Sequence, residues 1–154
     1  RAMTERTAAR DSAFFIALMA TALALGPALA HALELPAKIG MTVGEYFTVQ
    51  RIYQGWNQIA YVLALQAAGI LGVIALYWRV PAVRWPALVA LFALVGAQLL
   101  FWTLTFPANQ ATANWTQRVE NWEVLRMQWE YSHLAGAGFQ LLAMTSLVVG
   151  ALRR

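Results

Sequence analysis

An all-α, integral membrane four-helix bundle is the fold that this sequence predicts, and two observations predict it. Hydrophobic residues make up 60% of the 154 positions and charged residues only 12%, about half of the roughly 25% that soluble domains carry. Four apolar runs are each long enough to cross a bilayer as a helix, which takes about 20 residues. The sequence therefore predicts one transmembrane domain, residues 1–154, and argues against a soluble or disordered chain.

The four predicted spans follow one another along the chain and cover residues 12–35, 58–78, 85–106 and 132–152. Spans two and three are separated by six residues that include Pro81, which predicts an antiparallel hairpin with a tight turn. The connections at 36–57 and 107–131 are longer, and an even number of spans places both on one side of the membrane.

The first run has a second interpretation. Arg1, Arg6 and Arg10 precede it, and the small residues at 28–30 resemble a signal-peptide cleavage site, which would leave three spans. We expect a retained span.

The basic residues predict the orientation of the bundle. Seven of the eleven would share the side of the two termini and the short turn, and four would lie in the longer connections. Cytoplasmic loops carry an excess of Lys and Arg. We therefore expect both termini in the cytoplasm, both long loops outside and, as the location, a bacterial inner membrane.

Tryptophans at seven-residue spacing precede the fourth span. Trp115, Trp122 and Trp129 would share one stripe of a helix that continues from about Thr116 into the span. Such a helical extension predicts an amphipathic segment at the membrane interface, anchored by its indoles. The alternative is a surface on which a ligand stacks.

Two short motifs of opposite order mark the outer ends of spans one and four. His31 and Glu34 are three residues apart, and so are Glu130 and His133. Because the spans run in opposite directions, both histidines would lie deeper than both glutamates. The four side chains could meet if the two helices are neighbours, and ionisable groups at membrane depth are candidate functional groups by default.

Three interpretations of this set stay open. The first is a structural hydrogen-bonded network in which Arg126, four residues before Glu130, neutralises that carboxylate. The second is a catalytic or ligand site without metal. The third is a mononuclear transition-metal site in which His31, Glu34, Glu130 and His133 are the ligands. A di-iron site fits poorly because spans two and three contain no acidic residue. The chain also has no cysteine, which excludes disulfides, thiolate metal sites and thiol catalysis.

Small residues are expected where helices approach closely. They occur at Gly69 and Gly72 in the second span and at 135–138 in the fourth. Gln66 and Gln140 are expected to form interhelical contacts.

Several longer motifs carry a resemblance to a known family. They are Leu33–Ile39, Glu45-Tyr46, Val49–Trp56, Thr105–Gln110, Asn114–Thr116 and Leu125–His133. Together they resemble the anthrone-oxygenase-like family of small four-span membrane proteins, over nearly the whole chain and closest to a bacterial branch of mostly unassigned function. The Pro-Asn, Trp, Arg-x-x-Trp and His elements are the most specific part.

The resemblance implies a four-helix membrane bundle that oxidises polycyclic anthrones to quinones with O₂, without metal or organic cofactor. The matching positions are Asn109, Arg126, Trp129 and His133. This chain differs in having Leu134–Ala137 after the histidine, where relatives often carry an arginine.

Two functions follow as hypotheses. The first is an oxidoreductase that acts on a hydrophobic aromatic or quinone-like molecule in an outward-facing pocket of polar and aromatic residues. In it, His133 is the general base, and Arg126 and Asn109 stabilise an oxyanion. The alternative is a non-catalytic subunit of a larger membrane complex. The expected partners are the lipid bilayer, a larger complex or further copies of the chain, and a hydrophobic small molecule. Nucleic acid is not expected, and the substrate, the cofactor if any and the oligomeric state stay open.

Overall fold

The computed structural model describes residues 2–154, with side chains from Glu5 onward, and every regular element in that range is helical. Four helical segments are long and apolar enough to cross a membrane, which confirms the predicted fold class. Their main helices are α1 (Ala2–Lys38), α3 (Ile59–Leu76), α4 (Pro81–Leu100) and α6 (Trp122–Leu152). The N-terminal Arg1, which entered the predicted charge asymmetry, lies outside the described residues.

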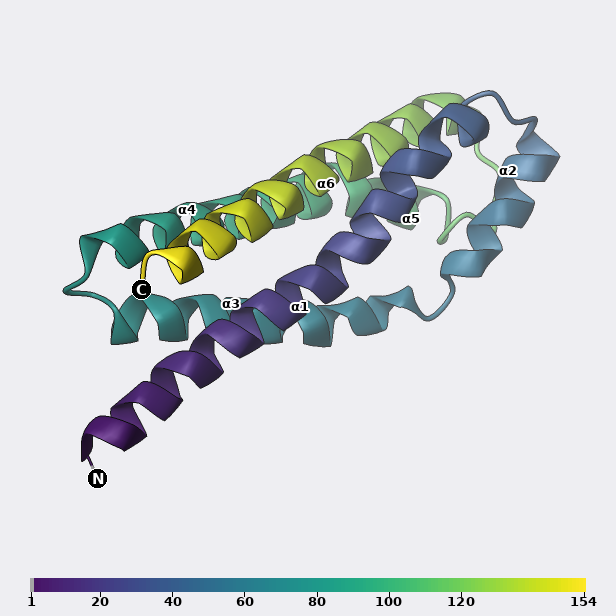
Figure 1. Cartoon of the computed structure of the whole chain (residues 1–154). Coiled ribbons are helices and arrows are strands. Elements are labelled where there is room, and N and C mark those ends of the chain that lie inside the picture. Colours follow the sequence, from purple (N-terminus) through teal and green to yellow (C-terminus); the bar gives the residue numbers. More distant parts are fainter. Residues whose placement is uncertain (1) are drawn as a thin grey trace.

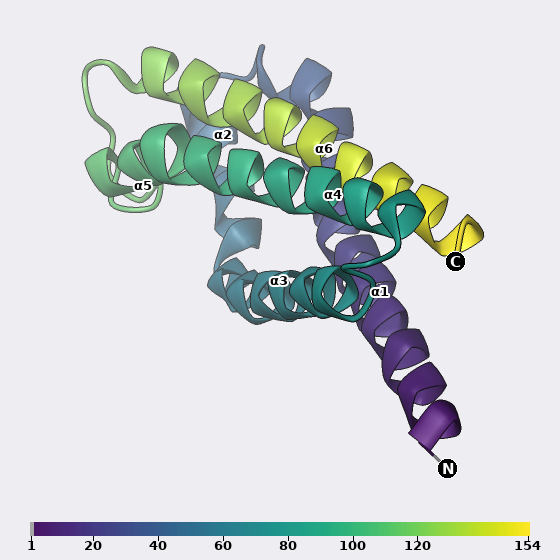
Figure 2. The same cartoon turned by 90° about the vertical axis from the view of Figure 1, so that its left-hand side faces the viewer.

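The four long helices form a bundle with two distinct ends (Figure 1). The chain termini and the α3–α4 turn share one end, which we call the hairpin end. The two longer connections share the other, which we call the loop end. Helix α4 packs chiefly on α6, α3 packs on α1, and α1 also packs on α6, as the turned view shows (Figure 2). Helices α1 and α6 are therefore neighbours, as the mirrored motifs require.

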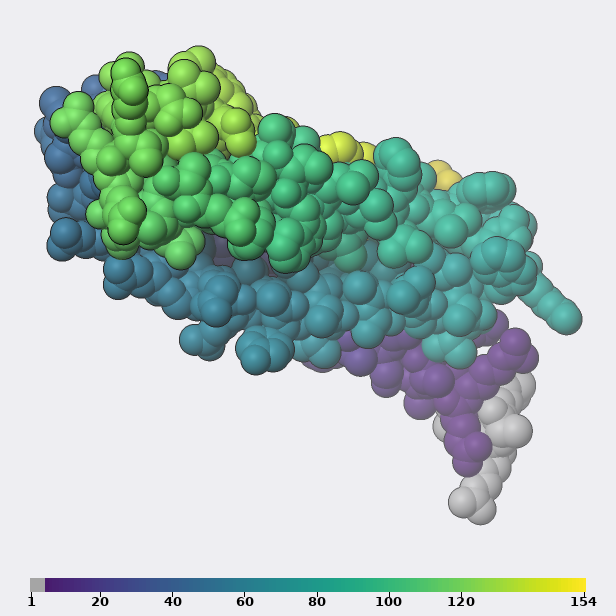
Figure 3. Space-filling model, turned by 180° about the vertical axis from the view of Figure 1, so that it is seen from behind, coloured from purple at the N-terminus to yellow at the C-terminus, as the bar shows by residue number. Residues whose placement is uncertain are grey.

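Helix α1 is longer than its predicted span at both ends. Its 37 residues extend over about 55 Å at 1.5 Å per residue, well beyond the roughly 30 Å of hydrocarbon in a bilayer. Its N-terminal turns project past the rest of the bundle (Figure 3). At the other end the helix continues through Pro36 to Lys38, and these added residues shape the candidate site.

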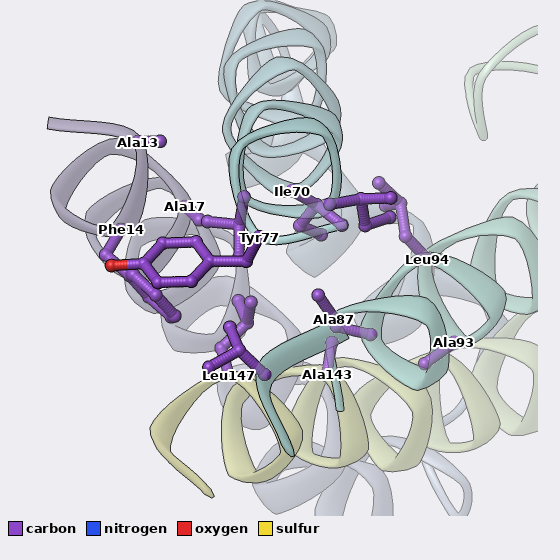
Figure 4. Packing of buried hydrophobic residues seen from close by; sticks show 14 residues of the cluster. Ala13, Phe14, Ala17, Ile70, Tyr77, Ala87, Ala93, Leu94, Ala143 and Leu147 are labelled. Carbon is purple, nitrogen blue, oxygen red and sulfur yellow. The ribbon is translucent and has the colours of Figure 1, made fainter. Parts of the chain in front are cut away.

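The core between the helices is built from small residues and a few large ones (Figure 4). Ala17 of α1 meets Gly69 of α3 so closely that a Cβ on Gly69 would lie 2.5 Å from the Ala17 backbone nitrogen. A Cβ on Gly96 would lie 2.8 Å from the Phe139 ring. Gly69 is therefore a packing glycine, as predicted, whereas Gly136 and Gly138 face open space.

A pair of glutamines joins α3 to α6 inside the apolar core. The Gln66 amide donates to the Gln140 carbonyl oxygen at 2.8 Å, and the Gln140 amide donates back at 3.3 Å. Both side chains are buried. The predicted interhelical contact is thus confirmed, and each amide satisfies the other inside the apolar core.

The third span changes helix type before it ends. A π-helical turn, Phe101–Thr105, follows α4, and α5 (Phe106–Ala111) continues it. Pro107 has no N–H and cannot make the usual bond to the residue four before it. In the same region the Leu104 carbonyl accepts the Gln128 side-chain amide of α6 at 2.7 Å. The span is thereby tied to α6 at the loop end.

The predicted start of the last helix is wrong. Residues 112–121 form turns, and α6 begins only at Trp122. Three successive residues, Ala113, Asn114 and Trp115, have φ of 48–60°, a left-handed conformation that a right-handed helix cannot contain. Trp115 therefore lies outside the helix that carries Trp122 and Trp129, although the helix does extend ten residues before the predicted span.

The connection at 36–57 is helical for most of its length. It contains α2 (Val43–Val49) and two 3₁₀ turns, Gln50–Tyr53 and Trp56–Gln58. The Glu45 carboxylate accepts hydrogen bonds from the backbone N–H and the hydroxyl of Thr42, which caps α2. These two bonds lower the pKa of the Glu45 carboxyl. The connection therefore places defined side chains over the loop end.

Candidate functional site

Polar and aromatic side chains from three parts of the chain meet at the loop end. We call them the loop-end cluster: His31, Glu34, Lys38, Tyr46, Tyr53, Trp129, Glu130 and His133. Helix α1 supplies three of them at spacings of three and four residues, α6 supplies three more, and the 36–57 connection supplies the tyrosines. Sequence order alone does not place these tyrosines beside the two helices.

The two histidines lie against each other, as the mirrored spacing predicts. The ring centroids of His31 and His133 are 4.3 Å apart. His133 also stacks on Trp129 at 3.9 Å. Tyr53 and Trp56 complete the wall around His31, with centroids 4.7 and 5.5 Å from its ring. Two imidazoles thus share one aromatic enclosure, where His31 is buried and His133 half-buried.

The hydrogen bonding of His133 defines the state of its ring. Its Nδ1 lies 2.8 Å from the backbone carbonyl oxygen of Trp129. A carbonyl oxygen can only accept, so Nδ1 carries the proton in this contact. In the neutral ring Nε2 is then the unprotonated nitrogen and the one that can act as a base.

Lys38, not Arg126, neutralises Glu130. The Lys38 Nζ lies 2.9 Å from Glu130 Oε1, and both side chains are almost wholly buried. No ion pair joins Arg126 to Glu130 in the part of the chain that the structure describes; Arg126 donates to the Met41 carbonyl at 2.7 Å instead. The expected Arg126–Glu130 pair is therefore wrong, because α1 continues far enough to bring a lysine to the carboxylate.

The same lysine links Glu130 to the acid of α1. The Lys38 Nζ donates to the Tyr53 hydroxyl at 3.0 Å, and that hydroxyl donates to Glu34. Glu34 Oε2 also lies 4.0 Å from both Lys38 Nζ and His31 Nδ1. Hydrogen bonds thus connect the half-buried Glu34 to Glu130 through Tyr53 and Lys38, whereas His31 Nδ1 lies near Glu34 without a hydrogen bond.

The two tyrosines of the cluster are held as neutral phenols. The Tyr46 hydroxyl donates to Glu130 Oε1 at 2.9 Å, and Tyr46 is fully buried. Burial, followed by the negative charge of Glu130, raises the pKa of Tyr46 far above 10. Burial and the hydrogen bond to Glu34 raise the pKa of Tyr53 in the same way. Both phenols therefore act as hydrogen-bond donors to carboxylates.

The other two predicted catalytic residues hold the frame of the site. The Asn109 Oδ1 accepts the indole N–H groups of Trp115 and Trp129 at 3.0 and 2.9 Å. Trp129 in turn supports the His133 ring. The Arg126 guanidinium stacks 4.7 Å from the Trp122 ring and holds the chain at Met41. Both residues thus fix the position of the rings around the imidazoles.

The tryptophan stripe points inward. Trp115, Trp122 and Trp129 are only 4–7% exposed and pack with Tyr46 in a second hydrophobic core. The expected interfacial anchor along the membrane surface is therefore wrong for these three, because Tyr46 and Tyr53 of the 36–57 connection pack on Trp122 and Trp129 and the turns at 112–121 bring Trp115 against Tyr46. Trp56, Trp78, Trp85 and Trp102 keep large exposed surfaces.

Several buried polar atoms near Tyr46 have no protein partner. They are Glu130 Oε2, both amide atoms of Gln50, and Arg126 Nε. Each of these residues interacts with Tyr46. Buried polar groups are usually satisfied, so these atoms leave hydrogen-bonding capacity unused, as does His31 Nδ1 beside Glu34.

In residues 2–154 no three of His, Asp and Glu come together as a metal-binding group. The ammonium of Lys38 takes up the position between the carboxylates of Glu34 and Glu130. The four-ligand metal site thus stays a prediction from residue spacing.

Lys38 and the two tyrosines are members of the cluster that the sequence does not predict. A signal for Lys38 is present, since His31, Glu34 and Lys38 follow a helical period. This signal is obscured by Pro36, because a proline at that position indicates that the helix ends at residue 35. Tyr46 and Tyr53 come from a connection whose position depends on the tertiary fold, so periodicity gives no signal for them.

Together, the fold and the cluster define a four-span helical membrane protein with a buried polar network at one end. Comparison of the chain with protein-family models, curated proteins and solved structures finds no match. The resemblance to the anthrone-oxygenase-like family therefore stays a prediction from the motifs.

Proposed function

We propose that the chain is a small membrane oxidoreductase that acts on a hydrophobic aromatic or quinone-like molecule at the loop end. The observation that carries this proposal is the pair of imidazoles inside an aromatic enclosure. Nε2 of His133 is the unprotonated nitrogen of the ring and is therefore available as a base. Aromatic walls suit a planar apolar substrate, which would reach the site from the bilayer.

The reaction class follows from the resemblance, with O₂ as the oxidant. His133 Nε2 takes a proton from an acidic CH₂ group flanked by aromatic rings, and the carbanion formed is delocalised into the ring system. O₂ then oxidises this carbon. Overall the CH₂ group becomes C=O, one oxygen atom enters the product, and the other leaves as water with the two hydrogens.

The remaining residues support the base rather than contact the substrate in this proposal. His31 lies against His133, and Glu34 near His31 would pass the abstracted proton toward water. Asn109 positions Trp129 through its side-chain oxygen. Arg126 donates to the Met41 carbonyl and so holds the 36–57 connection over the site. In this proposal Asn109 and Arg126 therefore position other residues and do not stabilise an oxyanion.

The proposed setting is a bacterial inner membrane with the hairpin end in the cytoplasm. Three of the arginines at that end, Arg79, Arg84 and Arg153, are at least partly exposed, and Arg84 stacks beside Trp78 and Trp85 at 5.2 and 5.1 Å. Positive charge with interfacial tryptophan is typical of a cytoplasmic boundary. The loop end would then face the outer side.

The second candidate is a non-catalytic subunit of a larger membrane complex. It is favoured by the way in which Lys38 and the tyrosines pair with Glu34 and Glu130 within the chain. A network of this kind can serve stability alone. Exposed apolar helix faces, such as those of Phe92 and Leu99 on α4, would then meet a partner chain.

One experiment separates the two candidates. The detergent-purified chain is titrated with anthrone and with a short-chain quinone while tryptophan fluorescence and O₂ uptake are followed. An oxidoreductase should show saturable quenching and O₂ uptake. Replacing His133 with Phe keeps a ring and should lower turnover at least about 100-fold, the lower range for loss of a general base.

The matched control is Arg118→Gln, an exposed residue of the 112–121 turns, which should leave turnover unchanged. A chain that binds neither compound and co-purifies in fixed ratio with another membrane protein would support the subunit instead.

A further inference from the structure

A basic hollow lies at the hairpin end, far from the loop-end cluster. It has a volume of about 140 Å³ and is lined by Arg6, Arg10, Ala75, Leu76, Trp78, Arg79 and Val80. Three of these side chains are cationic and none is acidic. It lies between the N-terminal turns of α1, which project past the bundle (Figure 3), and the end of α3.

Arg10 is the most firmly placed of the three arginines. Its Nη2 donates to the Leu76 carbonyl at 3.2 Å, and its guanidinium stacks 4.6 Å from the Tyr77 ring. Its Nε is buried and has no partner. Only part of its donor capacity is used, so the guanidinium is held in place with donors left over.

The acid next to Arg10 in the sequence pairs elsewhere. Asp11 follows Arg10 directly, but its carboxylate pairs with Arg154 at 2.6 Å. Arg6 lies one helical turn before Arg10, and Arg79 enters from the α3–α4 turn. The hollow therefore concentrates positive charge from two separate parts of the chain.

The size and the lining decide which anion fits. Sites for small organic ligands usually measure roughly 300–1,000 Å³, so about 140 Å³ suits a single phosphate group better than a whole metabolite. Arginines bind phosphate oxygens through paired N–H groups. Ala75, Leu76 and Val80 add apolar walls, and Trp78 is an exposed interfacial residue.

We propose that this hollow binds the phosphate group of an anionic phospholipid, whose acyl chains continue along the exposed faces of α1 and α3. Basic pockets between transmembrane helices are known to take such head groups. Two observations carry the proposal independently of the oxidoreductase: the acid-free set of three arginines and the partly unsatisfied Arg10. The site would anchor the projecting turns of α1 to the end of α3.

Native mass spectrometry of the detergent-purified chain with added phosphatidylglycerol or phosphatidylcholine tests this. Phosphatidylglycerol should bind at least about fivefold more tightly, which corresponds to about 1 kcal/mol for one basic residue at the membrane surface. The exposed Arg79→Gln should remove about that factor for phosphatidylglycerol alone, and high salt should weaken binding. Arg118→Gln at the loop end is the matched control.

Arg10→Gln is a second variant, and its folding is checked by circular dichroism because Arg10 also contacts Leu76. Equal binding of both lipids, or no change in Arg79→Gln, would overturn the site. Thermal stabilisation by inorganic phosphate that matches phosphatidylglycerol would show a free-anion site and overturn the lipid assignment.

Discussion

At the scale of single residues, Lys38 decides how the charged groups at membrane depth coexist. It bonds Glu130 at 2.9 Å and Tyr53 at 3.0 Å, and its ammonium lies 4.5 Å from the Trp129 ring centroid. An unpaired carboxylate in a low-dielectric environment is far more costly than a paired one. The cluster thus depends on one cation supplied by the last turn of α1.

Replacing Lys38 with Met should destabilise the chain by about 3–5 kcal/mol, because Glu130 is left buried without a partner. Methionine keeps most of the length and loses the charge. Unfolding in a detergent–SDS titration measures the effect, and the exposed Arg118→Met is the control. The double variant with Glu130→Gln should recover part of the loss, because the uncompensated charge is gone. A Lys38→Met chain as stable as the parent would contradict this.

The two phenols predict a stability loss in alkali. The pKa of Tyr46 and that of Tyr53 are raised in the folded chain by burial and by neighbouring carboxylates, from an ordinary value of 10.0. A raised pKa means that the unfolded chain loses these protons first. The stability they contribute is therefore full below pH 10 and falls as the pH rises above it.

Near-ultraviolet absorbance of tyrosinate measures the pH at which each of these phenols ionises in the detergent-solubilised chain. In the folded chain, Tyr46→Phe and Tyr53→Phe should each remove a tyrosine that titrates late. Loss of a tyrosine that titrates near pH 10 instead would contradict the assignment.

At the scale of helical elements, Gly69 sets the approach of α1 to α3. An added Cβ would lie 2.7 Å from the Ala17 Cα, against backbone that cannot move aside alone. Gly69→Ala should destabilise the bundle by about 1–3 kcal/mol, as overpacking does. Gly136→Ala on α6 meets nothing within 4 Å and should be neutral or slightly stabilising, because Ala favours a helix. SDS unfolding of both compares them, and equal effects would contradict the contact.

Element boundaries show where sequence reasoning succeeds and where it stops. The four spans follow from apolar length, which the bilayer imposes on any sequence. The end of α1 was missed because Pro36 disfavours but does not forbid a last helical turn. The start of α6 differs from the predicted one because the seven-residue tryptophan spacing fits a helix, whereas the non-helical residues 116–121 leave no periodic signal.

At the scale of the whole molecule, the candidate site is partly predictable for the same physical reason. His31 and His133 could be placed together because helix spacing and opposite span directions fix their depth. Lys38, Tyr46 and Tyr53 could not, since their positions depend on how the 36–57 connection folds over two helices. Spacing in the sequence shows which residues share one face of a helix, but it does not show which residues of two different helices form an ion pair.

The polarity of the bundle remains the prediction with the widest consequence. The arginine-rich hairpin end should face the cytoplasm, and the loop end should face outward. The chain has no cysteine, so single cysteines report position without background. Gln117→Cys at the exposed loop end should react with an impermeant maleimide in intact cells. A cysteine added after Arg154 should react only after permeabilisation.

The reverse labelling pattern would show that the bundle has the opposite orientation in the membrane. The basic hollow would then lie in the outer leaflet, and a proton passed from His133 through Glu34 would be released on the cytoplasmic side. The two ends are fixed relative to each other by the α1–α3 and α1–α6 packing. One labelling result therefore assigns a membrane side to both the anionic-lipid site and the imidazole pair.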